Sequence, residues 1–130
     1  MDRRRFEHLV EQALASLPPE ILAHVDNVVF LVEDWPDPET LDALGIGRRD
    51  GLLGLYQGCP LPERSTEVSG VLPDRVVLYQ RPIERHAAWE RLPVRRVIRE
   101  TLIHEVGHYL GLDESELAQL EGRRAPEEEP

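Results

Sequence analysis

The sequence predicts one α+β domain in which a long helix lies across a small mixed or antiparallel sheet. The chain has 130 residues, enough to bury one modest core but too few for two. Three short runs with strand character occupy its middle, the first of them rich in β-branched residues, whereas helical periodicity precedes the first run and follows the last. This order of segments is typical of an α+β domain.

The N-terminal half begins with helical spacing and then changes to strand spacing. Residues 4–16 place apolar side chains on one helix face, and the prolines of "LPPE" end that helix. A short second helix is expected to carry Pro19 in its first turn. The apolar run at 27–34 predicts a buried strand, and a loop then leads to a short helix that stops at Gly45.

Two further strands are expected in the middle of the chain. The stretch "GLLGLYQGCPLP" suggests the second strand, with glycine punctuation, and "ERSTEVSGVLPD" suggests a mobile loop after it. Residues 75–83 predict the third strand, which ends where Pro82 removes a ladder donor.

Helical sequence dominates the last third of the chain. Residues 85–110 have a helical pattern with a break at 92–94, and the short segment "ESELAQLE" predicts one more helix. The last residues, 123–130, have no apolar anchor, so we expect a disordered acidic tail after a single domain at 1–122.

The composition excludes several classes of protein. The net charge of −10 argues against nucleic acid or anionic lipid as a partner, because both attract clustered positive charge. The chain has no run of 18 apolar residues and no apolar leader, so we expect a cytoplasmic protein. Cys59 is the only cysteine, which excludes an intrachain disulfide and a cysteine-based zinc finger.

The stretch "ETLIHEVGHYLGLDESE" contains the H-E-x-x-H pattern of a metal-binding helix. One helical turn separates His104 from His108, roughly 6 Å along the axis and about 40° around it, so both imidazoles can bind one Zn²⁺. Glu105 is then close enough to act as general base for a water on the metal. The alternative is a pair of ordinary surface histidines. In a random chain of this composition, however, the pattern is expected to occur only roughly 0.02 times.

A catalytic zinc site usually has three protein ligands, so the chain must supply a third. Gly111 can adopt positive φ and turn the chain back toward the metal. Glu114 follows three residues later and is our first choice as a carboxylate ligand. We rank the shorter Asp113 second, and Glu116 and Glu121 lower because they would need a different turn.

Read as H-E-x-x-H-x-x-G-x-x-E, the stretch resembles the zincin metallopeptidases, and its turn glycine resembles their metzincin branch. That branch has histidine where this chain has Glu114, and it has a methionine turn, whereas Met1 is the only methionine here.

A closer resemblance is to the small bacterial zincin-like metallopeptidases, from "VVFLVEDWPDPE" to "LIHEVGHYLGLDE", over roughly residues 25–120. The eleventh motif position of that family is commonly aspartate, and here it is Glu114. The resemblance implies a minimal zincin-like fold and a zinc site, with no settled physiological substrate.

Other candidate residues carry weaker signals. We interpret His8 and His24 as partly exposed structural residues and Tyr109 as a packing residue. His86 follows the third strand, where it could approach the site as a transition-state donor, although a structural role is the stronger interpretation. Gly107, inside the helix, indicates close packing by a neighbour.

Two functions remain open from the sequence. The first is a zinc-dependent peptidase in which His104, His108 and Glu114 hold one Zn²⁺ per chain and Glu105 activates water. Its substrate would be a peptide or protein, which the third strand would align by edge pairing. The second is a non-catalytic, metal-stabilised binding module. The oligomeric state cannot be predicted.

Overall fold

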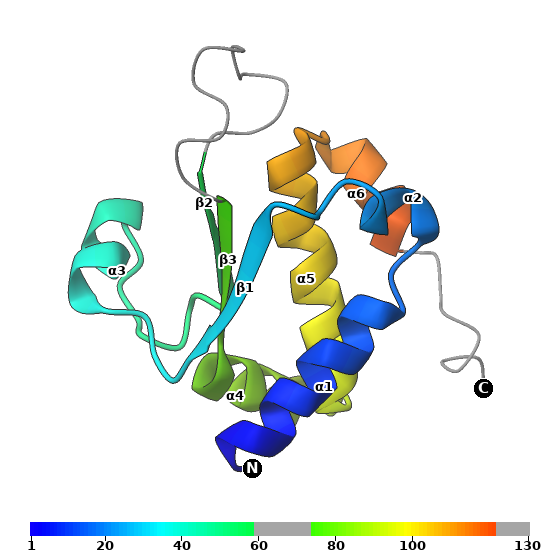
Figure 1. Ribbon diagram of the computed structural model, residues 1–130. Coiled ribbons are helices and arrows are strands. Elements are labelled where there is room, and N and C mark those ends of the chain that lie inside the picture. Colours follow the sequence, from blue (N-terminus) through cyan, green and yellow to red (C-terminus); the bar gives the residue numbers. More distant parts are fainter. Residues whose placement is uncertain (59–73, 122–130) are drawn as a thin grey trace.

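The computed structural model describes residues 1–58 and 74–121 of the chain, which form helices packed against a three-stranded sheet. Figure 1 shows these elements in sequence colours. In chain order they are α1 (Arg3–Ala15), α2 (Pro19–Leu22), β1 (Val28–Glu33), α3 (Pro38–Leu44), β2 (Gly54–Gln57), β3 (Asp74–Tyr79), α4 (Gln80–Glu90), α5 (Val94–Leu110) and α6 (Glu114–Glu121). The α+β prediction is therefore confirmed.

The sheet is mixed, with the strand order β1-β3-β2. β1 is parallel to β3, with Phe30 opposite Val76, and β2 is antiparallel to β3, with Tyr56 opposite the same residue. Our expectation that the third strand would align a peptide by edge pairing is wrong, because β3 is paired on both sides. β1 and β2 are the outer strands of the described sheet, so its open edges belong to them.

The third strand is shorter than the sequence suggested. β3 ends at Tyr79, and Gln80 already begins α4, whereas we expected the strand to continue to Ile83. Pro82 lies in the first turn of α4, where its missing N–H has no helical acceptor to lose. The proline therefore favours a helix start at this position rather than a strand end.

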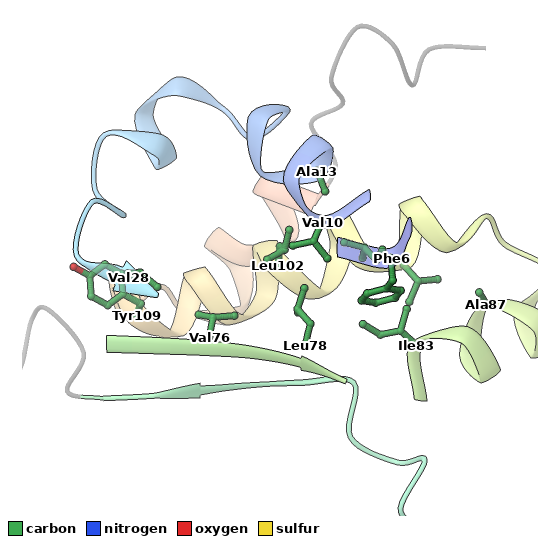
Figure 2. Close-up of a cluster of buried hydrophobic side chains, with 12 residues drawn as sticks. Phe6, Val10, Ala13, Val28, Val76, Leu78, Ile83, Ala87, Leu102 and Tyr109 are labelled. Atoms are coloured by element: carbon green, nitrogen blue, oxygen red, sulfur yellow. The ribbon is translucent and has the colours of Figure 1, made fainter. Parts of the chain in front are cut away.

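The core lies between one face of the sheet and the helices α1 and α5 (Figure 2). α1 contributes Phe6 and Val10, β3 contributes Val76 and Leu78, and α5 contributes Leu102; all five are at most 5% exposed. Figure 1 shows α3 on the opposite side of the sheet from α5. The long helix is thus held on the sheet by a continuous apolar contact.

Several helix boundaries follow the local signals in the sequence. α2 begins with Pro19, as expected, and α3 ends at Gly45, which has a left-handed φ of 70°. Asp37 caps the start of α3, because its Oδ1 accepts a hydrogen bond of 2.7 Å from the Thr40 amide.

Some predictions fall on residues outside the described part of the chain. They are Cys59, the tail at 123–130, and all but Asp74 of the predicted mobile loop. Within residues 1–58 and 74–121, no helix is long and apolar enough to cross a membrane.

Candidate functional site

Two histidine side chains converge on the exposed side of α5. The Nε2 atoms of His104 and His108 lie 3.2 Å apart, and the ring planes are tilted by 54°. Two nitrogen ligands about 2.0–2.1 Å from a tetrahedral zinc ion would lie about 3.3 Å apart. The observed separation therefore fits two neighbouring corners of such a site, and the donor chemistry suits zinc as well.

The chain turns sharply where α5 ends. Gly111 has a φ of 74°, and its amide donates to the His108 carbonyl at 3.1 Å. The next amide, of Leu112, donates to the Gly107 carbonyl at 2.9 Å, which completes a Schellman motif. The prediction that Gly111 ends the helix with positive φ is confirmed.

Asp113 and Glu116 form a reciprocal capping box at the start of α6. Oδ1 of Asp113 accepts from the Glu116 amide at 2.8 Å, and Oε1 of Glu116 accepts from the Asp113 amide at 3.0 Å. Both carboxylates are therefore engaged in holding the start of this helix. Of the alternative third ligands weighed from the sequence, these two already have a structural role.

Glu114 is the first residue of α6, and its side chain lies outside what the structure describes, as does that of Glu121. Among the side chains that the structure does describe, no three histidine, cysteine, aspartate or glutamate groups gather as a metal site.

α6 is held against α5 by an apolar contact at a glycine. A Cβ atom added to Gly107 would overlap the side chain of Leu117, which is 3% exposed. The expectation that a neighbour packs closely on Gly107 is confirmed, and the neighbour is α6. This contact sets how near the start of α6 lies to the two histidines.

Glu105 is buried beside β2, at 8% exposure. Its Oε1 accepts a hydrogen bond of 2.9 Å from the Tyr56 amide. Burial raises the pKa of the Glu105 carboxyl, although positive charge on His108 and His104 and the bond from the Tyr56 amide oppose that rise. A carboxylate in this environment is more basic than one in water.

Gly54 allows β2 to approach Glu105 closely. A Cβ atom added to Gly54 would lie 2.7 Å from Cγ2 of Thr101 and 3.3 Å from Cγ of Glu105. Sequence reasoning did not assign this residue to the site. The signal was present, because a glycine inside a strand often marks a close approach of another element.

A cavity of about 300 Å³ opens beside His104 and Glu105. His86 lines the same cavity from α4, so it does approach the site, while a role as donor stays a prediction. Tyr109 is 4% exposed within the core, and its ring meets that of Tyr56 at 5.8 Å, which agrees with a packing role. His8 and His24 are exposed.

Comparison with known proteins identifies a family and a similar fold. Residues 25–124 match the model of a family described as zincin-like metallopeptidase. A solved structure of a conserved hypothetical protein from Thermus thermophilus is similar, with a TM-score of 0.53 and 23% sequence identity. The similarity covers 91% of this chain and 98% of that chain, and it supports the fold. No curated protein matches.

Proposed function

The chain belongs to the zincin-like metallopeptidase family, and from that premise we propose that it is a zinc-dependent peptidase. In this proposal His104, His108 and Glu114 hold one Zn²⁺ per chain, and Glu105 is the general base. The substrate is a peptide or an unfolded segment of a protein.

One observation carries the proposal: two imidazole Nε2 atoms 3.2 Å apart stand next to a buried carboxylate on the same helix. An ordinary pair of surface histidines has no need for a buried acid beside it, since burying a carboxylate is costly. Burial of a carboxylate is useful at a catalytic site, because burial makes the carboxylate more basic.

The structural roles of the neighbouring acids support Glu114 as the third ligand. Asp113 and Glu116 are engaged in the capping box, and Glu121 lies two turns farther along α6. Glu114 is the first residue of α6 and follows the turn at Gly111 by three positions. A histidine pair with one carboxylate is a common ligand set of catalytic zinc.

A zinc ion held by His104, His108 and Glu114 would supply Lewis-acid chemistry, which can lower the pKa of water to about 7. Glu105 accepts the proton from the attacking water and later gives it to the leaving amine. Its hydrogen bond from the Tyr56 amide fixes the direction of the carboxylate. β2 therefore positions the base as well as forming an edge of the sheet.

We place the substrate along the outer edge of β2. The Tyr79 amide donates to the Leu53 carbonyl, so the backbone groups of the alternate residues, Gly54 and Tyr56, point away from β3. Because the Tyr56 amide already donates to Glu105, the substrate would pair with the other backbone groups of this edge. An extended peptide that adds to this edge would pass beside Glu105.

The test is zinc analysis combined with cleavage of a broad peptide library. Glu105→Gln should keep its zinc but cleave about 100-fold more slowly than the wild type, the usual loss when a general base is removed. Glu11→Gln, which changes an exposed acid on α1, should behave as the wild type.

Equal, chelator-sensitive cleavage by the wild type and Glu105→Gln would remove Glu105 from the mechanism. If both proteins bind zinc and cleave nothing, while chelation lowers the melting temperature of each, the chain is a metal-stabilised binding module instead.

A further inference from the structure

A second, larger cavity adjoins the one beside His104. It has a volume of about 610 Å³, and its wall includes His86, which also lines the smaller cavity. Its remaining lining residues are Arg48, Asp50, Gly51, Arg85, Ala88 and Trp89. Both volumes are in the usual range for ligand sites.

One continuous stretch of chain forms a wall of both cavities. Arg48, Asp50 and Gly51 line the larger cavity, and Leu52, Leu53 and Gly54 line the smaller. The same stretch leads directly into β2, whose Tyr56 amide bonds to Glu105. A peptide that follows β2 past the site would therefore run into the larger cavity.

The larger cavity carries positive charge that is not fully offset. Arg48 donates to both oxygens of Asp50, at 3.0 and 3.1 Å, and holds the pKa of that carboxyl below its usual range. Arg85 is only 3.5 Å from the same carboxylate. Among the described lining residues Asp50 is the one acid, so a single carboxylate faces two guanidinium groups.

Arg85 is oriented by an aromatic ring as well. Its guanidinium lies 4.8 Å from the ring centre of Trp35, and Arg49 stacks on that ring at 3.9 Å. Trp89 lies on the cavity wall and is 85% exposed, which is unusual for so large an apolar side chain. Positive charge and an exposed aromatic ring thus meet at one place, on a protein of net charge −10.

We propose that this cavity is a subsite for a carboxylate of the peptide substrate, bound by Arg85 and flanked by Trp89. The inference rests on the proposed function for the position of the peptide. The planar fork of an arginine suits a carboxylate, and Trp89 offers apolar contact to the neighbouring part of the peptide. The carboxylate belongs either to an acidic side chain or to the C-terminal end of the peptide.

The experiment measures binding, so it does not depend on catalysis. Zinc-loaded Glu105→Gln is titrated with octapeptides of alanine and leucine that are blocked at both ends and carry one glutamate at each position in turn. A matched set carries glutamine, and a third, neutral set has a free C-terminal carboxylate. Trp89 lines this cavity and Trp35 is the only other tryptophan, so a change in tryptophan fluorescence on titration is the signal for binding at Trp89.

We expect glutamate at one or two positions, or the free C-terminus, to bind about five- to tenfold more tightly than its neutral match. This factor lies between those of a screened surface ion pair and a charge-assisted hydrogen bond. Which of the two sets shows the gain identifies the source of the carboxylate. Arg85→Gln should abolish the gain and leave the affinity for glutamine peptides unchanged, whereas the control Arg95→Gln should keep it.

The proposal is overturned if charged and neutral peptides bind equally, or if the preference survives in Arg85→Gln. Failure of the wild type to cleave any peptide would overturn the proposed peptidase activity alone, because the binding preference is measured on a variant designed to be inactive.

Discussion

The two sides of α5 are held by different kinds of contact, although both contacts depend on a glycine. On one side, Gly54 lets β2 approach within reach of Thr101 and Glu105, and the Tyr56 amide bonds to the Glu105 carboxylate. On the other side, Gly107 is covered by an apolar side chain of α6. The first contact is polar and directional, and the second is apolar packing.

This difference suggests that the two parts of the proposed chemistry depend on different neighbours of the helix. The strand side positions the general base, whereas the α6 side positions the segment that starts with Glu114. Substitutions on the two sides should therefore separate catalysis from metal binding.

The largest effect is expected on the α6 side. Leu117→Ala removes most of a buried side chain that packs on Gly107, which should lower the free energy of unfolding by about 2–5 kcal/mol. Because α6 is then less firmly held, zinc affinity should fall as well. Urea unfolding and a competitive chelator titration measure the two quantities. Loss of stability with unchanged zinc affinity would show that α6 contributes nothing to the metal site.

A smaller loss of stability is expected on the strand side. Gly54→Ala places a Cβ atom 2.7 Å from Thr101 and should cost about 1–3 kcal/mol through overpacking. Displacement of Glu105 should lower kcat about 10- to 100-fold, while the zinc affinity should stay within about twofold of that of the wild type. Peptide cleavage and zinc titration on the same preparation test this. A variant that loses zinc and activity together would mean that the two sides are not independent.

The smallest effect on stability is expected at the start of α6. Asp113→Ala removes the capping box and should cost about 1 kcal/mol, with little change in zinc affinity. Glu114→Ala should weaken zinc binding by more than about 100-fold, since a ligand is lost rather than one of its supports. A chelator titration that gives the opposite order would identify Asp113 as the ligand.

Local features of the site could be predicted from the sequence, because they depend on residues close together in the chain. The facing histidines follow from the spacing of four, and the turn at Gly111 follows from the tolerance of glycine for positive φ. The start of α2 at Pro19 and the end of α3 at Gly45 follow from similar local rules.

The features that depend on distant parts of the chain could not be predicted. Nothing near β3 indicates that it pairs on both sides, and the contact of Gly54 with Glu105 joins residues about fifty positions apart. Pro82 is compatible with both a strand end and a helix start. The predicted strand end is wrong, because Pro82 lies in the first turn of α4. Sequence periodicity identifies elements but does not order them in space.

The zinc content of purified His108→Ala tests the central proposal most directly, with His8→Ala, an exposed histidine on α1, as its control. Elemental analysis of the wild type and the control should give close to one zinc per chain. His108→Ala should have almost none, because two remaining ligands hold zinc poorly. Full retention of zinc in His108→Ala would contradict the metal site and the mechanism built on it.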